Sequence, residues 1–293
     1  MSNNFIEDNN PSTYLIESMS RPGYSLESAI ADLVDNSITA KSKNVEIYGK
    51  FEGQDSWVCI EDDGDGMTED ELKLAMKIPS GDPTEIRENN DLGRFGLGLK
   101  IASFSQCKMF TVITFKGNKK FSRTWDKDHV RKTQKFQTFI IPPNNSIAKK
   151  IYENSKKDSG TIVVWEKLDK VTTDWDKSEK FENIWVDNFT LIGNHLEIVF
   201  HKFLSKNLSI KTNWNFDKGQ LKKLNPWDPY MTGHKQTLKK PDQDIEGAKI
   251  TPIILPNRKN LNEDERAMLS GIRGVNNHQG FYIYRNNRLI VDG

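Results

Sequence analysis

The sequence predicts an α+β fold, and three observations support this class. Residues 26–41 carry apolar side chains at helical spacing, as expected of an amphipathic helix. Residues 45–51 alternate apolar and polar side chains and are followed, after a polar turn, by the apolar run 57–60, which predicts a hairpin. Residues 160–165 form an apolar, β-branched run that is typical of a central strand.

Length and composition indicate a polar protein with more than one domain. A chain of 293 residues is long enough for two domains, and its 42 basic and 41 acidic residues nearly balance, so net charge indicates no partner. No apolar run approaches the roughly 20 residues of a membrane span, and the N-terminus lacks the blocks of a signal peptide. Cys59 and Cys107 lie in apolar stretches, as is usual in a reducing compartment. We therefore expect a cytoplasmic protein.

Three segments are expected along the chain. Residues 1–24 are polar apart from the patch Tyr14-Leu15-Ile16, which has no obvious element of its own to pack with, and they predict an arm that docks elsewhere. Residues 25–205 predict the main domain. Residues 206–293 contain short strands and proline-containing loops, which predict a second, mostly β or α+β domain. Because the chain ends directly after a strand, we expect this second domain to be incomplete.

Further elements of the main domain follow from the same patterns. Residues 109–115 and 121–125 predict a strand pair around Gly-Asn-Lys-Lys. Two helices are expected near 177–189 and 192–205, because apolar residues in the second of these recur at helical spacing. A strand over 208–212 is assigned to the second domain.

The helix at 26–41 carries the first candidate chemistry. Its buried stripe is expected to contain Leu26, Ile30, Leu33, Val34 and Ser37. Asp32 and Asn36 lie four residues apart beside this stripe, so they stack one turn above each other. An amide oxygen is a hard ligand for Mg²⁺, and a carboxylate can take a proton from an attacking water. Taken alone, such a pair is more often a solvated polar face.

Two glycine-containing segments follow the helix. Asp62-x-Gly64-x-Gly66 comes directly after a strand, and Met67 and the N-cap Thr68 follow it, with Glu71 completing a capping box. Such a segment lets a carboxylate accept a hydrogen bond while the backbone passes close to a flat ring. Each Asp-Gly pair could also be only a turn.

The third segment follows a long loop. Residues 78–92 have no periodicity and many breakers, which predicts a functional lid or a disordered loop. They lead into Gly93-Arg94-Phe95-Gly96-Leu97-Gly98-Leu99-Lys100, which opens a helix. Glycines at a helix N-terminus expose backbone N–H groups to an anion such as phosphate. A lone glycine-rich loop is weak evidence, but the three segments in this order predict a nucleotide site.

These segments resemble the Bergerat-fold ATPases, the GHKL group of DNA gyrase B, heat-shock-ninety chaperones, histidine kinases and MutL. The resemblance covers about residues 10–205. Ala-Asp-Leu-Val-Asp-Asn-Ser-Ile and Gly-Arg-Phe-Gly-Leu-Gly-Leu-Lys are most similar to the first and third motifs of the MORC ATPases and their prokaryotic relatives. The resemblance implies a two-layer α/β sandwich, a mixed sheet covered by helices, followed by a partial transducer-like domain of the ribosomal S5-like type.

The resemblance also implies roles for individual residues. Asn36 would bind Mg²⁺ that bridges the phosphates of ATP, Asp62 would read the adenine amino group, and Asp32 would be the general base. The other nucleotide-binding positions implied are Gly64, Gly66, Met67, Gly93, Arg94, Phe95, Gly96, Leu97, Gly98, Lys100 and Thr161. In gyrase, MutL and MORC proteins the base is a Glu, so Asp32 is one methylene shorter. Positioning errors of about 1 Å can cost on the order of a hundredfold, so we expect slow hydrolysis.

The resemblance favours an ATP-operated switch that dimerises with nucleotide and serves DNA repair, chromatin-like compaction or antiviral defence. Residues 116–135 are rich in Lys and Arg, with Phe121 and Trp125 interleaved, and could contact DNA or be a solvated face. An effector domain or partner protein is expected beyond residue 293. One alternative is a chaperone-like scaffold with little turnover. A histidine kinase is less favoured, because the first His is His129, behind all three motifs.

Overall fold

The computed structural model describes residues 15–19, 24–78, 98–172, 174–216, 220–270, 274 and 279–292. The chain divides into two compact units. The first unit is Met1–Ile192 with Leu208–Lys223, and the second is Gly193–Asn207 with Leu224–Gly293. Each unit therefore draws on two separate segments of the sequence.

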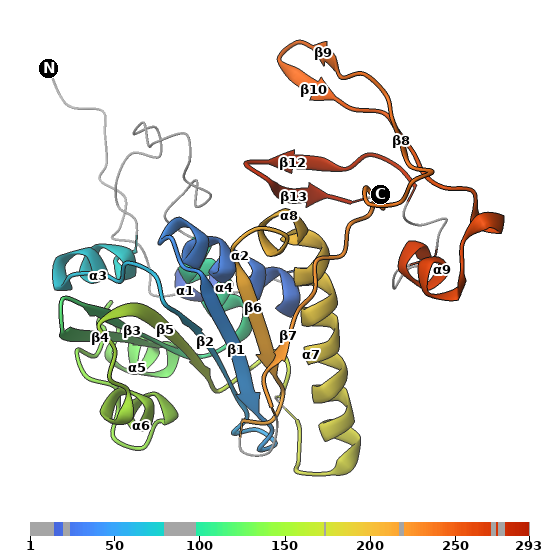
Figure 1. Ribbon diagram of the computed structural model, residues 1–293. Coiled ribbons are helices and arrows are strands. Elements are labelled where there is room, and N and C mark those ends of the chain that lie inside the picture. The colour runs from blue at the N-terminus through green and yellow to red at the C-terminus, as the bar shows by residue number, and fades with distance from the viewer. Residues whose placement is uncertain are drawn as a thin grey trace, which may run out of the picture. The chain divides into compact units, whose positions relative to one another are not determined.

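A seven-stranded sheet forms the centre of the first unit, with the strand order β4-β3-β5-β2-β1-β6-β7 (Figure 1). Its strands are β1 (Asn44–Lys50), β2 (Trp57–Asp62), β3 (Met109–Lys116), β4 (Lys119–Asp126), β5 (Ser159–Glu166), β6 (Ser209–Asn213) and β7 (Lys222–Lys223). Neighbouring strands are antiparallel except β1 and β6, which run parallel. This mixed sheet packed against helices confirms the predicted α+β class and fits a Bergerat fold.

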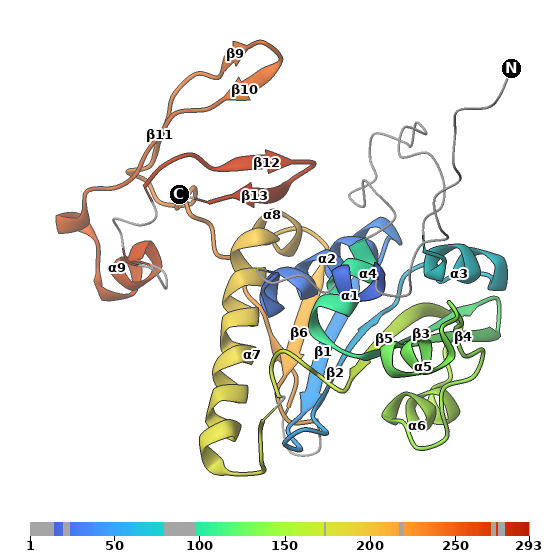
Figure 2. The same cartoon turned by 180° about the vertical axis from the view of Figure 1, so that it is seen from behind.

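One face of the sheet, which we call the Asp62 face, is covered by helices (Figure 2). The covering helices are α2 (Leu26–Thr39), α4 (Gly98–Gln106) and α7 (Glu179–Val199). Ser37 of α2 donates a hydrogen bond to Asp62, and Trp165 of β5 donates one to Ser103 of α4. On β1, Gly49 leaves room for α7, because a Cβ there would lie 2.8 Å from the ring of Trp185.

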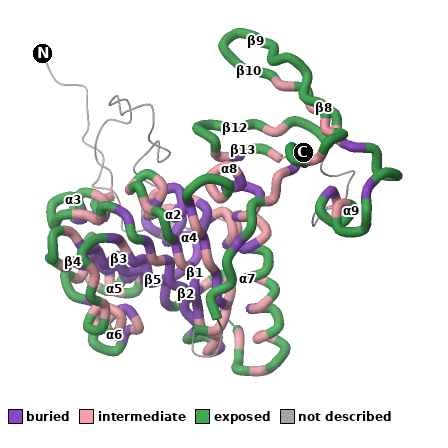
Figure 3. Tube along the Cα trace, in the orientation of Figure 1, coloured by how far each residue is buried: buried purple, intermediate pink, exposed green. Residues whose placement is uncertain are grey.

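The opposite face carries a second apolar layer beneath α6 (Ile147–Asn154). Its buried residues are Tyr48, Trp57, Cys59, Ile113, Phe115, Ala148, Ile162 and Val164. Ile147, Ile151 and Tyr152 of α6 pack against this layer. With both faces covered, β2, β3 and β5 are the most buried strands of the unit (Figure 3).

Several sequence predictions can be compared with this unit. The hairpin, the strand pair, the helix at 26–41 and the capping box of Thr68 with Glu71 are confirmed. The two helices expected near 177–189 and 192–205 are wrong in their division, since α7 is one helix and only the short α8 (His201–Leu204) follows it. The apolar stripe explains the difference: Trp185, Phe189, Ile192 and Leu196 are all buried at spacings of three or four residues.

The strand expected at 208–212 lies in the first unit rather than in a second domain. It is β6, whose residues pair in parallel with β1, for example Ile210 with Val45. The position of a strand in a sheet depends on the strand with which it pairs, and the pattern of apolar residues does not identify that partner. The helices α3 (Glu69–Met76) and α5 (Lys127–Thr133) complete the unit beside the sheet.

The arm contains one described element, the short helix α1 (Leu15–Ser18). Ile16 in this helix is only 1% exposed. The expectation that this apolar patch lacks any packing within its own chain is therefore wrong at Ile16. The remainder of the predicted arm, apart from residue 19 and Tyr24, lies outside the described residues.

The second unit consists of short elements around a small core. After α8, its elements are β8 (Leu238–Lys239), β9 (Gln243–Ile245), β10 (Ala248–Ile250), β11 (Ile253–Ile254), η1 (Arg258–Asn260), α9 (Glu263–Ser270), β12 (Ile283–Arg285) and β13 (Arg288–Val291). Its strands pair two by two, as β9 with β10, β8 with β11 and β12 with β13. Met231, Leu261 and Leu269 form a buried cluster with Leu255 beside it. The transducer-like character of this unit stays a prediction.

Candidate functional site

The helix α2 presents the first candidate residues because one side of it is fully buried. Ser25 caps its N-terminus by accepting a hydrogen bond from the backbone N–H of Ser28. The expected stripe is buried, and Asp32 and Asn36 at its border are half-buried. A polar side chain at such a border can reach a ligand while its helix stays anchored in the core.

Asp62, at the end of β2, is the centre of the candidate site. Its Oδ1 accepts hydrogen bonds from the backbone N–H groups of Gly64 (2.9 Å) and Thr161 (3.2 Å), and its Oδ2 accepts one from the Ser37 hydroxyl (3.0 Å). Burial raises the pKa of the Asp62 carboxyl, and these hydrogen bonds oppose that rise. An ionised carboxylate offers about four acceptor positions. Three are occupied, so Oδ2 keeps one position for a further donor.

The glycines that follow Asp62 allow close approaches that no side chain could make. Gly66 has a φ of +63°, and a Cβ on it would lie 1.9 Å from the carbonyl oxygen of Phe115. A Cβ on Gly64 would lie 2.7 Å from the carbonyl oxygen of Ala40, at the end of α2. The loop after β2 therefore packs between α2 and β3, and only glycine fits at these positions.

Two further predicted residues are held beside this loop. The backbone N–H of Met67 donates to Oγ1 of Thr114 on β3 at 2.7 Å. Thr161 pairs with Asp62 across β5 and β2, and its backbone N–H bonds to the carboxylate as described above. The structure thus brings Asp62, Gly64, Gly66, Met67 and Thr161 together, and their role in nucleotide binding stays a prediction.

The third motif is described only in part. Gly93, Arg94, Phe95, Gly96 and Leu97, and all of the predicted lid except residue 78, lie outside the described residues. Gly98 begins α4, with open space where a Cβ would be. Lys100 is 1% exposed, and its ammonium donates to the carbonyl oxygen of Ala75 in α3 at 2.6 Å. A phosphate contact by Lys100 stays a prediction, and it would have to compete with this bond.

Asn36 and Asp32 differ in what surrounds them. Within the described part of the chain, the Asn36 side-chain amide makes no hydrogen bond, so its oxygen is available to a cation. Asp32 is engaged, because the hydroxyl of Tyr24 donates to its Oδ2. The described residues contain no group of three or more His, Cys, Asp or Glu side chains that could hold a metal ion. A single amide oxygen suits Mg²⁺, which usually takes few protein ligands and completes its shell with phosphate and water.

Sequence reasoning missed Ser37 as a site residue, and it also missed Tyr24. Ser37 was expected only as a member of the buried stripe, although a hydroxyl on a buried helix face requires a polar partner. A polar partner such as Asp62 could therefore have been expected for the Ser37 hydroxyl from the sequence. For Tyr24 no local pattern gives a signal, because its partner lies eight residues away in α2.

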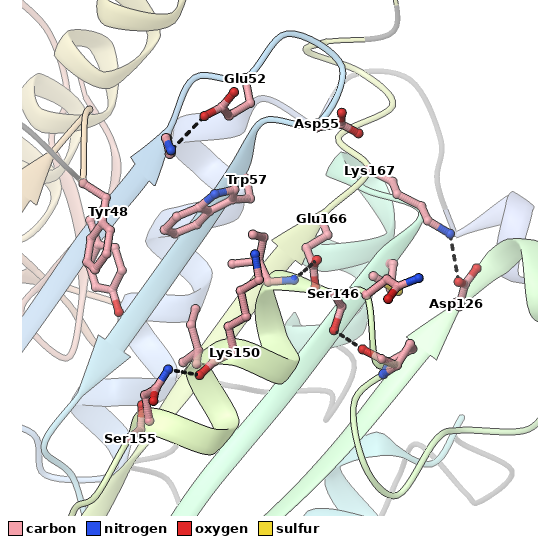
Figure 4. Close-up of a pocket in the computed structure, with 18 of the residues that line it drawn as sticks. Tyr48, Glu52, Asp55, Trp57, Asp126, Ser146, Lys150, Ser155, Glu166 and Lys167 are labelled. Carbon is pink, nitrogen blue, oxygen red and sulfur yellow. Dashed lines mark hydrogen bonds and ion pairs between the residues drawn. The ribbon is translucent and has the colours of Figure 1, made fainter.

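A cavity of about 920 Å³ lies on the opposite face of the sheet, beside α6 (Figure 4). Tyr48 and Trp57 form its aromatic wall, and Glu166 at its floor accepts hydrogen bonds from the N–H groups of Ile147 and Ala148. Several charges around it are already paired, as in Lys50 with Glu52 and Lys167 with Asp126. None of the predicted nucleotide residues lines this cavity.

Several of the basic residues in 116–135 make contacts within the chain. Lys116 pairs with Glu71, Arg123 with Glu69 and Lys127 with Asp169, and Lys120 donates to the carbonyl oxygens of Tyr152 and Ser155. Trp125 is 3% exposed and bonds to the Met76 carbonyl, so it is a core residue and cannot stack on a base. Lys119, Lys132 and Lys135 are exposed.

Comparison with known proteins agrees with this geometry. Residues 24–161 match the family of histidine kinase-, DNA gyrase B- and HSP90-like ATPases. This segment contains the first and third motifs and all of the residues that surround Asp62, so this part of the first unit is similar to ATPase domains of the GHKL type. The specific likeness to MORC or MutL proteins stays a prediction.

A solved structure titled as the N-terminal domain of a DNA repair protein is also similar, with 18% identity, 71% of this chain covered and a TM-score of 0.44. The chain spans 55% of the length of that structure. No protein with a curated description matches in sequence. None of the helices among the described residues is long and apolar enough to cross a membrane.

Proposed function

We propose that this chain binds ATP with Mg²⁺ and hydrolyses it slowly, as a conformational switch. The observation that carries the proposal is the buried Asp62 carboxylate, which is fixed by three donors and keeps one acceptor position on Oδ2. The exocyclic amino group of adenine is a donor that fits this position. The glycine loop beside Asp62 lets a flat ring approach the backbone.

The other residues take the roles that their chemistry allows. Asn36 would offer its amide oxygen to Mg²⁺, which when bound would offset the charge of the phosphates. Asp32 would accept the proton of the water that attacks the terminal phosphorus, while the bond to the bridging oxygen breaks and ADP and phosphate are released. The short reach of Asp32 supports slow turnover. The glycine segment from Gly93 to Gly98, with Lys100, would hold the phosphates.

A thermal-shift titration tests the binding proposal. Saturating ATP with Mg²⁺ should raise the melting temperature of the wild-type chain, because a ligand of the native state stabilises it by mass action. Asp62→Ala should lose this shift. Asp65→Ala is the matched control in the same loop, since Asp65 is exposed and pairs with Lys41, and it should keep the shift. An unchanged wild-type melting temperature would contradict the proposal.

Variants of α2 separate metal binding from hydrolysis. Asn36→Ala should remove the Mg²⁺ dependence of ATP binding. Asp32→Asn should bind ATP but release no phosphate, because an amide cannot take a proton from water. Turnover by Asp32→Asn at the wild-type rate would show that another group is the base. Binding without turnover in the wild type would favour the chaperone-like scaffold.

The output of the switch is proposed from the resemblance. ATP would order the lid and join two protomers, and hydrolysis would release them. The second unit would be the transducer-like domain, and a partner protein would receive the signal. Antiviral defence, chromatin-like compaction and DNA repair are the processes we consider, with the cytoplasm as the compartment.

DNA contact through residues 116–135 is a second, separable proposal. Lys119, Lys132 and Lys135 are exposed cations available to phosphate groups. If they bind DNA, affinity should fall steeply with salt, because phosphate contacts release counterions. Replacing all three with Glu should flatten that dependence, whereas replacing Lys150 with Glu, an exposed lysine outside this segment, should leave it nearly unchanged. Salt-insensitive binding would support the solvated-face interpretation.

A further inference from the structure

We propose that Tyr24 is a positioning residue for Asp32, an inference that rests on the proposed ATPase function. The Tyr24 hydroxyl donates a hydrogen bond to Oδ2 of Asp32. Tyr24 directly precedes Ser25, the N-cap of α2, and Asp32 lies in the middle of that helix. A residue outside the helix therefore holds the side chain proposed as general base.

Tyr24 is itself fixed from a second element. The side-chain amide of Gln106, the last residue of α4, donates to the backbone carbonyl oxygen of Tyr24 at 2.9 Å. Gln106 is 1% exposed and also donates to the hydroxyl of Ser105. The Ser25 cap fixes the chain on the other side of Tyr24. These bonds fix the backbone of Tyr24, and so they fix the position from which its hydroxyl donates to the Asp32 carboxylate.

This anchoring matters because of the length of Asp32. A general base must lie within hydrogen-bond reach of the water that it deprotonates, in a defined direction. Fixing Oδ2 limits rotation of the carboxylate and so sets the direction of Oδ1. A short aspartate has less freedom to correct a wrong approach than a glutamate would have. The hydrogen bond from Tyr24 thus orients the Asp32 carboxylate, whose short side chain limits its reach toward the water.

The connection also joins two of the motifs. α4 begins at Gly98, in the segment proposed to hold the phosphates, and ends at Gln106. The path from Gln106 through Tyr24 to Asp32 therefore links that helix to the proposed base by two hydrogen bonds. A change in either helix would reach the carboxylate through Tyr24.

The test is Tyr24→Phe, which removes the hydroxyl and keeps the ring. We expect kcat for ATP hydrolysis to fall about tenfold with KM and the melting temperature nearly unchanged, because the loss affects orientation rather than binding. Tyr48→Phe is the matched control: its hydroxyl donates to Glu61 on the opposite face of the sheet, and its kcat should equal that of the wild type.

The outcomes separate this inference from the function beneath it. An equal or higher kcat in Tyr24→Phe would overturn the positioning role and leave the ATPase proposal intact. A fall in melting temperature with a matching rise in KM would likewise overturn it, since that pattern indicates a structural role. Absence of ATP binding or turnover in the wild-type chain would overturn both. A lower kcat with KM and the melting temperature unchanged supports the inference.

Discussion

The hydroxyl of Ser37 donates to Oδ2 of Asp62 at 3.0 Å, and both residues are nearly fully buried. This bond joins α2, which carries Asp32 and Asn36, to the end of β2, where the proposed adenine contact lies. The residue beside Ser37 in the helix is Asn36. Two motifs that are separated by 25 residues in sequence therefore have a fixed relation in space.

Removing this bond should weaken adenine nucleotide binding. Ser37→Ala removes the hydroxyl that donates to Oδ2 of a buried carboxylate, which costs about 1–3 kcal/mol. We expect an affinity for ATP about tenfold lower, measured by isothermal titration calorimetry. Ser42→Ala is the matched control, because Ser42 donates to Asp63 and not to Asp62. An unchanged affinity in Ser37→Ala would show that Asp62 does not depend on this donor.

Gly66→Ala should destabilise the fold far more than an ordinary glycine substitution. Its φ of +63° is unfavourable for alanine, and the new Cβ would overlap the Phe115 carbonyl oxygen. Gly117→Ala provides a control for the backbone strain alone, because Gly117 has a φ of +58° and open space around it. Urea unfolding should show a loss of about 1–2 kcal/mol for Gly117→Ala and above about 3 kcal/mol for Gly66→Ala. Equal losses would mean that the loop can move away from β3.

The sequence pattern predicted much of the first unit, because many of its elements depend on residues that are close together in the sequence. The helix at 26–41, the hairpin and the capping box depend on neighbours within a few residues, which the sequence contains directly. The division between residues 189 and 192 failed because the apolar stripe of α7 continues through it. The position of β6 failed because its partner, β1, lies more than 150 residues earlier along the chain than β6 does.

The candidate site was predictable where chemistry and spacing coincide. Asp62 with Gly64 and Gly66 gave the position of the buried carboxylate, and the structure brings Thr161 to it. The donors that fix this carboxylate and Asp32, above all Tyr24, depend on tertiary contacts that leave no periodic signal. The same is true of Lys100, whose bond to Ala75 arises from the packing of α4 beside α3.

The contribution of Asp63 to the free energy of unfolding is expected to depend on pH. Partial burial would raise the pKa of this carboxyl, but hydrogen bonds from Asn44, Ser42 and Lys43 outweigh it and lower the pKa to about 2. A lowered native pKa means that the stabilisation is fully present above the unfolded-state pKa of about 3.9 and is lost as pH falls toward about 2.

Asp63→Asn tests this stability term by urea unfolding at several pH values. At neutral pH the variant should be less stable by about 1 kcal/mol, since the group is largely exposed. The difference should narrow as pH falls below about 4. Asp65→Asn, which loses only an exposed ion pair with Lys41, should change stability by less than about 0.5 kcal/mol. A difference that stays constant down to low pH would exclude the proposed titration.

The last prediction concerns how the switch joins two protomers. A non-hydrolysable ATP analogue should drive dimerisation, and the arm at residues 1–24 should be required for it, as in the proteins that this chain resembles. Ile16 is buried within its own chain, so deletion of the whole arm would also disturb the first unit. Deleting only residues 2–14 keeps α1 in place and removes the part proposed to cross to the partner. Analytical ultracentrifugation should then show monomers with the analogue present, while thermal shift shows intact nucleotide binding. Analogue-driven dimers of this deletion variant, as strong as those of the wild type, would show that the arm does not hold the protomers together.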